Sequence, residues 1–264
     1  MIRLAILPVL SGLLIAGAAQ GQTATAPMDP RSRAPEDLTG YWVAVVTEDW
    51  RYRMLTPDKN DFTGIALNAA GRAQMQKWEP STDRTSGEPC RSYGAAAIMR
   101  VPTRLHISWQ DGSTLKVETD AGEQTRLFHF AGSPPHDVAA SWQGYSAALW
   151  EGLKPRGGFG GVTAGLPTTA GLATTGTAPK QDGYLKVLTT QLRPGYLRRN
   201  GVPYGAQTSV EEYFDSFREP NGDVWLVITS IVTDPEYLDQ PFITSSQFKK
   251  TDASGWSPTP CEAG

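Results

Sequence analysis

The sequence predicts an all-β protein, an antiparallel barrel of about ten strands with one short helix. Short segments rich in Val, Ile, Thr and aromatic residues recur from residue 41 to residue 249. Turn-forming pairs such as Asp111-Gly112 and Asn221-Gly222 separate several of them. The third observation is that the chain lacks the strand–helix alternation of a parallel sheet. A barrel and a β-sandwich both protect sheet edges, and we favour the barrel because short connections are typical of a meander.

The chain begins with the pattern of a secretory signal peptide over residues 1–21. Arg3 precedes an apolar run that ends at Ala19, and Ala19-Gln20-Gly21 fits a small-x-small cleavage site. A retained membrane anchor is the alternative, which the interrupting Pro8 and glycines disfavour. We therefore expect a periplasmic or secreted protein with no stable membrane insertion after signal cleavage.

The mature chain is expected to have a disordered, Pro- and Thr-rich lead-in over residues 22–37 and a single barrel domain over 38–264. The one expected helix covers residues 68–78, with Asn68 as its N-cap. The expected strands cover residues 41–46, 51–55, 104–110, 114–120, 123–131, 141–151, 184–191, 209–218, 223–233 and 242–249. A Gly-, Thr- and Pro-rich insertion at 153–183 interrupts them, and its composition fits either a disordered loop or a lid.

Composition excludes several classes of function. With 24 Lys and Arg against 27 Asp and Glu, the net charge is −3, so a polybasic nucleic-acid binder is excluded. The three histidines, His106, His129 and His136, lack the spacing of metal ligands. Ser146 lies in an alternating strand rather than in a nucleophile elbow. We expect no metal, no cofactor and no covalent nucleophile.

The only two cysteines, Cys90 and Cys261, both follow a proline in loop-like sequence. In an exported protein an even pair of this kind predicts one disulfide. Two free thiols are the alternative.

Several segments, in order and spacing, are similar to a family of exported, mostly uncharacterised bacterial proteins with a predicted lipocalin-like barrel. The segments that carry the resemblance are Cys90 with residues 97–102, residues 141–146 and 150–152, residues 187–190 and 199–203, residues 212–214, and residues 233–235 and 240–242. The resemblance implies a fold far more than a reaction. Many relatives have Gly-His-Ser where this chain has Gly144-Tyr145-Ser146, so a histidine mechanism or metal site shared by the family is not expected here.

Glu212 is the strongest candidate for acid–base chemistry. It shares one face of its strand with Val210 and Phe214, and an apolar setting can adapt a carboxylate to proton transfer. Tyr145 or His129 would then serve as the acid. The alternative is a buried ion pair of Glu212 with Arg126, Arg193 or another guanidinium.

Aromatic and basic side chains predict a small-molecule site as well. The candidates for enclosing and orienting a ligand are Trp42, Trp50, Arg126, Trp142, Trp150, Arg193 and Tyr196. The sequence therefore favours an exported barrel that binds a small, mainly apolar or aromatic molecule. A cofactor-free hydratase, dehydratase, isomerase or lyase is the alternative, and a structural envelope protein with a filled interior is a third possibility.

Overall fold

The computed structural model describes residues 29–132, 134, 139–155 and 181–263 of the chain. The expected signal peptide, residues 22–28 of the lead-in, most of the insertion and His136 lie outside the described residues. Within this part of the chain, no helix is long and apolar enough to cross a membrane.

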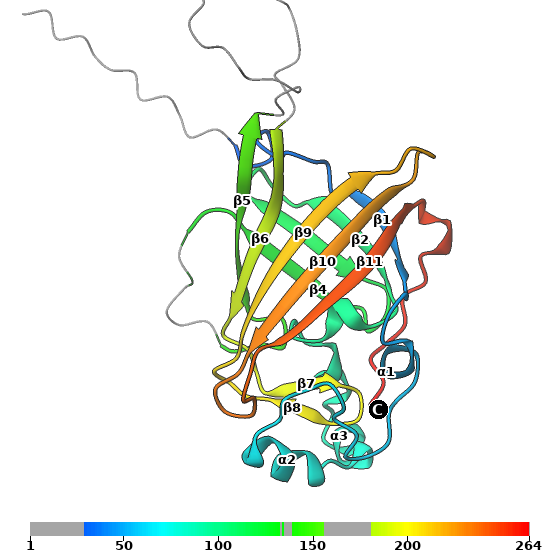
Figure 1. Cartoon of the computed structure of the whole chain (residues 1–264), viewed down its shortest axis with the longest axis vertical. Coiled ribbons are helices and arrows are strands. Elements are labelled where there is room, and N and C mark those ends of the chain that lie inside the picture. Colours follow the sequence, from blue (N-terminus) through cyan, green and yellow to red (C-terminus); the bar gives the residue numbers. More distant parts are fainter. Residues whose placement is uncertain (1–28, 133, 135–138, 156–180, 264) are drawn as a thin grey trace, which may run out of the picture.

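Nine strands form a closed barrel in the described part of the chain, in the order β1-β11-β10-β9-β6-β5-β4-β3-β2 (Figure 1). Their bounds are β1 Gly40–Val45, β2 Arg104–Trp109, β3 Thr114–Thr119, β4 Thr125–His129, β5 Tyr145–Pro155, β6 Gln181–Thr190, β9 Ser209–Arg218, β10 Val224–Thr233 and β11 Phe242–Thr251. The all-β barrel class is confirmed, while the β-sandwich alternative is wrong.

One neighbouring pair of strands departs from the antiparallel prediction. β4 and β5 are parallel, with Phe128 opposite Ser146 and His129 opposite Ala147. Parallel neighbours require a connection that returns the chain to the end of the sheet at which the first strand began. β4 and β5 are therefore not joined as the hairpin that a meander would place here.

The helices differ from the sequence prediction in number and place. The segment 51–55, expected as a strand, is instead helical over residues 51–54, within α1, Trp50–Met54, and Leu55 is the C-cap. The segment is too short to distinguish the two-residue period of a strand from the 3.6-residue period of a helix. In the helix, Arg53 is the buried residue. The predicted helix is confirmed as α2, Ala69–Gln76, where the Asn68 side chain accepts a hydrogen bond from the Gly71 amide at 2.8 Å. The remaining helical segments are α3 Pro80–Thr85 and the 3-10 turns η1 Pro89–Tyr93, η2 Ile98–Arg100 and η3 Ala253–Gly255.

Alternation along the strands fills the barrel interior with apolar side chains. On β10, Leu226 and Ile228 are fully buried while their neighbours are only partly so. The interior set is Trp42, Leu105, Ile107, Leu115, Val117, Phe128, Leu185, Val187, Phe214, Leu226, Ile228 and Phe248. These side chains give the barrel a packed core along most of its length. Burying each of them contributes about 1.5–3 kcal/mol to stability.

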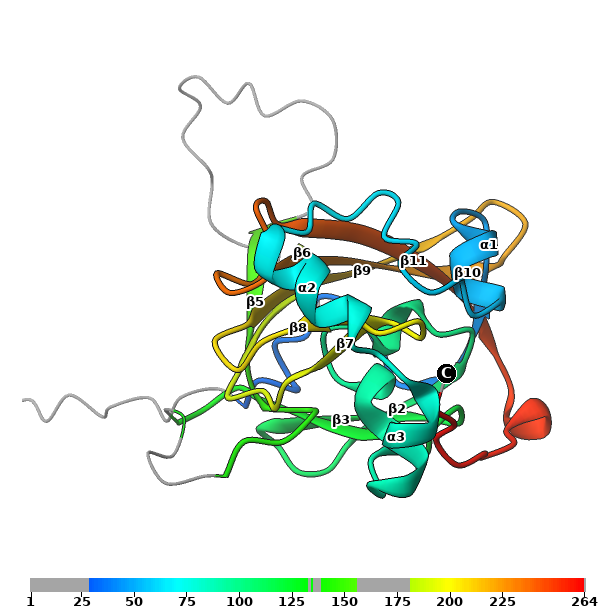
Figure 2. The ribbon, with the colours of Figure 1, turned by 90° about the horizontal axis from the view of Figure 1, so that it is seen from below.

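A second apolar layer covers the end of the barrel at which β2 begins. The hairpin of β7 (Gly195–Arg198) and β8 (Val202–Tyr204) lies beneath the barrel with α2 and α3 (Figure 2). No strand was expected between residues 191 and 209, but Gly201 at φ +80° supplies the turn of this hairpin beside the Trp78 ring. We call this the closed end of the barrel.

The predicted disulfide is confirmed. Cys90 in η1 and Cys261 in the C-terminal tail are bonded at an S–S distance of 2.00 Å and are 171 positions apart in the sequence. The bond fixes the tail to the closed end, where Cys261 Sγ also lies 3.3 Å from the Gly122 carbonyl oxygen. The alternative of two free thiols is wrong.

Candidate functional site

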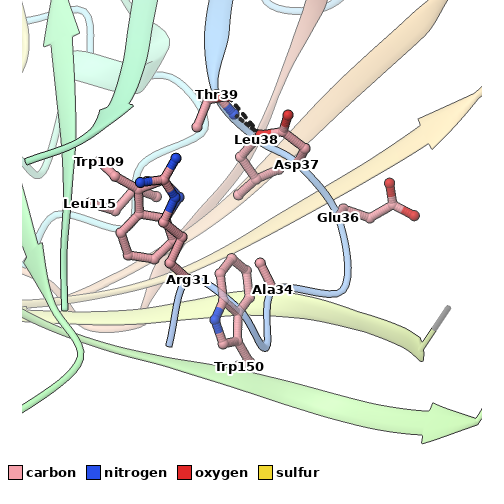
Figure 3. Close-up of a pocket in the computed structure, with 9 residues that line it drawn as sticks. All are labelled: Arg31, Ala34, Glu36, Asp37, Leu38, Thr39, Trp109, Leu115 and Trp150. Carbon is pink, nitrogen blue, oxygen red and sulfur yellow. Dashed lines mark hydrogen bonds between the residues drawn. The ribbon is translucent and has the colours of Figure 1, made fainter. Parts of the chain in front are cut away.

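A pocket lies at the opposite end of the barrel, between its rim and residues 29–39, which we call the rim segment (Figure 3). The cavity has a volume of about 240 Å³. The residues that line this mouth pocket are Arg31, Ala34, Glu36, Asp37, Leu38, Thr39, Trp109, Leu115 and Trp150. It therefore combines an apolar barrel wall with a polar covering segment.

The barrel wall supplies the aromatic side of the pocket because of strand alternation. Trp109 is the last residue of β2 and shares the inward face of Leu105 and Ile107. Trp150 continues the face of β5 on which Ser146 and Ala148 are buried, while Leu149 on the other face is exposed. Phe130 joins the two indoles, with ring centroids 5.4 Å from Trp109 and 5.2 Å from Trp150. These rings form a continuous aromatic surface at the mouth.

Hydrogen bonds fasten the rim segment to the barrel. The Trp150 indole N–H donates to the Pro30 carbonyl oxygen at 2.8 Å, and the Trp42 indole N–H donates to the Leu38 carbonyl oxygen at 2.9 Å. Both contacts join an indole from the wall to backbone of the covering segment. The segment is therefore anchored near both of its ends.

Three charged residues, Arg31, Glu36 and Asp37, are in the lining of the pocket. Asp37 accepts hydrogen bonds from the backbone amide and the hydroxyl of Thr39, at 2.9 and 2.7 Å. Partial burial opposes the charged form, but these bonds and the positive charges of Lys250 and Arg31 hold the pKa of Asp37 below its usual value. The Asp37 carboxylate and the Arg31 guanidinium thus lie in the polar part of the lining, across from the aromatic barrel wall.

The candidate base Glu212 lies elsewhere, inside the barrel wall. Its carboxylate accepts hydrogen bonds from both terminal nitrogens of Arg126, at 3.0 and 2.5 Å. Both side chains are fully buried. Of the alternatives left open by the sequence, the structure has the ion pair, with Arg126 rather than Arg193 as the partner.

A small polar network surrounds this ion pair. Arg126 Nη2 also donates to the Thr189 hydroxyl at 3.1 Å, and the Ser146 and Thr189 hydroxyl oxygens lie 2.7 Å apart. The Arg126 guanidinium lies over the Phe128 ring, 4.9 Å from its centroid. The two buried charges therefore pair with each other inside the core, while Arg126 Nε has no acceptor among the described residues.

The three predicted catalytic residues do not converge. His129 and Tyr145 stack on each other, with ring centroids 4.8 Å apart, on the outward face of the barrel. Their neighbours Phe128 and Ser146 are the residues that face inward, on the same side as Glu212. The barrel wall therefore separates the candidate base from both candidate acids.

Of the predicted ligand-binding residues, only Trp150 lines the mouth pocket. Trp42 is buried in the core, and Trp50 is 64% exposed on α1. Arg126 is in the buried ion pair with Glu212. The remaining three lie near the closed end, where the Arg193 guanidinium packs 4.5 Å from the Trp142 ring centroid and pairs with Glu88. Tyr196 is also there, donating its hydroxyl to Asp83 at 3.1 Å.

Sequence reasoning missed most of the mouth pocket. Trp109 carried a usable signal, because it follows Leu105 and Ile107 at period two. Arg31, Asp37 and Leu38 carried none, since the lead-in has no periodic pattern that would place it across the barrel.

Comparison with protein-family models finds no match to this chain. Comparisons with curated proteins and with solved structures find no significant match either.

Proposed function

We propose that this protein is an exported, lipocalin-like barrel that binds a small, mainly apolar or aromatic molecule at the mouth pocket. The observation that carries the proposal is the cavity of about 240 Å³ between the aromatic rim and the rim segment. Small-molecule sites are concave, mostly apolar and supplied with a few polar groups that fix orientation. Trp109 and Trp150 supply flat apolar surface, while Arg31 and Asp37 supply the polar groups.

Burial of Glu212 supports binding over acid–base catalysis. A general base must come within about 2.6–3.2 Å of the proton that it removes. The Glu212 carboxylate is fully buried and engaged by Arg126, and it is absent from the lining of the mouth pocket. The packed interior likewise favours a ligand at the rim over one in the centre of the barrel.

The disulfide supports the export part of the proposal, because such bonds persist in oxidising compartments. The closed nine-stranded barrel supports the lipocalin-like part. Membership of the exported bacterial family rests on the sequence segments alone.

A fluorescence titration with N-phenyl-1-naphthylamine, a neutral apolar aromatic dye, tests the binding site. We expect saturable binding that Trp150→Ala weakens about tenfold or more, because the substitution removes one aromatic wall and its bond to the rim segment. Trp50→Ala is the matched control, since this indole is exposed on α1. Equal dye affinity of the two variants would refute the proposed site.

A further inference from the structure

Three arginines are buried together at the closed end of the barrel. Arg53 comes from α1, Arg100 from η2 and Arg198 from β7, and their exposed fractions are 4%, 7% and 4%. They line one small pocket together with Tyr52, Ser92 and Arg199. We call this group the arginine cluster. Arg100 precedes the start of β2, whereas Trp109 ends it, so the cluster and the mouth pocket are at opposite ends of the barrel.

Several buried hydrogen-bond donors of the cluster have no acceptor among the described residues. Arg53 Nε donates to the Arg100 carbonyl oxygen at 2.9 Å, but Arg53 Nη1 and Nη2 have no acceptor among the described residues. Nε and Nη1 of Arg198 and Nε of Arg199 likewise meet no acceptor in that part of the chain. Buried donors are normally satisfied, because each unmade bond to a charged group costs several kcal/mol.

Packing holds the guanidiniums in place without using these donors. The Arg198 guanidinium lies 4.2 Å from the Tyr52 ring centroid, and that of Arg100 lies 5.2 Å from the Phe242 centroid. Arg53 is fixed by its single bond through Nε. The planar forks are therefore positioned in advance, which lowers the entropic cost of engaging an acceptor.

The charges of the cluster are only partly balanced. Burial lowers the pKa of Arg53 and of Arg198, and the positive charge of Arg100 lowers both further. The acidic groups that act on Arg53 and Arg198 are Glu48, Asp49 and Asp61, whereas Arg199 pairs with Glu262 at 3.6 Å. Of these, Asp49 pairs with Arg100 at 3.1 Å from a half-exposed position, and Asp61 lies 3.8 Å from Arg51. Because a guanidinium does not lose its proton in proteins, an excess of buried positive charge remains.

We propose that the arginine cluster binds a compact oxyanion, either free phosphate or sulfate or the same group on a small molecule. Several guanidinium forks from different elements match the geometry of a tetrahedral oxyanion. The pocket has a volume of about 30 Å³, so it is of the size of a compact group rather than of a large ligand. This site is independent of the mouth pocket and of the proposed function.

Calorimetric titration of the mature protein with inorganic phosphate tests the inference, with sodium chloride of equal ionic strength as the reference. We expect saturable phosphate binding and a melting temperature raised by about 3 °C or more at 10 mM phosphate over the chloride reference. Sulfate should compete. Tighter binding of glycerol 3-phosphate than of phosphate would assign the site to a phosphate ester, and equal binding would assign it to the free ion. A response to phosphate no larger than that to chloride would overturn the proposal.

Variants locate the site. Arg198→Met should weaken phosphate binding about tenfold or more, because it removes two unsatisfied buried donors. Arg218→Met is the matched control: Arg218 is exposed at the end of β9 and donates only to the Gly222 carbonyl oxygen among the described contacts. Arg198→Lys retains the positive charge but loses the planar guanidinium, so it should also weaken phosphate binding. It replaces the methionine variant in this test if that variant does not fold. Phosphate affinity equal to wild type in a folded Arg198 variant would refute this site.

Discussion

The buried ion pair of Arg126 and Glu212 makes a quantitative prediction for Glu212→Gln. The substitution preserves the size of the side chain but removes its charge, so the Arg126 guanidinium stays buried without a counterion. The only other side-chain oxygen that accepts from Arg126 within the described residues is the Thr189 hydroxyl. Removing one partner of a buried pair costs about 3–5 kcal/mol. Since glutamine still offers one acceptor oxygen, we expect a loss of about 3 kcal/mol.

Urea unfolding followed by circular dichroism, with the disulfide intact, measures this loss. For a domain of this size, about 3 kcal/mol corresponds to a fall in melting temperature of roughly 10 °C. Glu211→Gln is the matched control, because Glu211 is the adjacent residue on the opposite face and pairs with Lys186 at the surface, at 3.1 Å. That exposed pair should contribute little to stability.

The double variant Arg126→Met/Glu212→Leu separates loss of the pair from exposure of one charge. We expect its stability to equal or exceed that of wild type, because apolar replacement of both buried charges removes their desolvation cost. A Glu212→Gln protein as stable as Glu211→Gln would refute the reasoning. It would indicate that Glu212 is accessible to water, and it would return the acid–base alternative to consideration.

Two further predictions concern the disulfide and the rim segment. Alkylation under denaturing, non-reducing conditions should add no label to Cys90 or Cys261, and two added labels on the wild-type protein would contradict the disulfide. The Cys261→Ser variant should lose about 3–5 kcal/mol of unfolding free energy, because the bond closes a long loop. In the rim segment, the pKa of Asp37 in the folded protein is lower than its usual value of 3.8. The charged carboxylate therefore stabilises the fold at pH values above 3.8, and this contribution is lost as the pH falls through the lower pKa of the folded state. Wild-type stability should therefore fall more steeply than that of Asp37→Asn below about pH 4. Parallel pH profiles from urea unfolding would contradict it.

Local pattern was sufficient to predict most of the barrel strands. β9 was predicted at its observed bounds, because Val210, Glu212 and Phe214 alternate with more exposed residues and clear turn signals flank the strand. The segment that forms α1 was mispredicted as a strand, because five residues are too few to distinguish the two-residue period of a strand from the 3.6-residue period of a helix. The parallel pairing of β4 and β5 was also missed, since the direction of a strand depends on the path of its connection rather than on its own residues.

The candidate site was less accessible to sequence reasoning. Alternation placed Glu212 on an apolar face, and Arg126 was among the partners considered, but pairing across 86 positions depends on barrel register. The same limit applies to the tryptophans. Trp42 and Trp109 both face inward, yet only the position along the strand decides that Trp42 packs in the core while Trp109 lies at the rim.

The most direct test of binding at the mouth pocket is an NMR titration of the tryptophan indole N–H signals with N-phenyl-1-naphthylamine. The chain has eight tryptophans, and single Trp→Phe variants assign their signals. We predict that the signals of Trp109 and Trp150 shift with dye concentration while those of Trp50 and Trp142 do not. Unchanged Trp109 and Trp150 signals at saturating dye, or shifts confined to other tryptophans, would contradict the account.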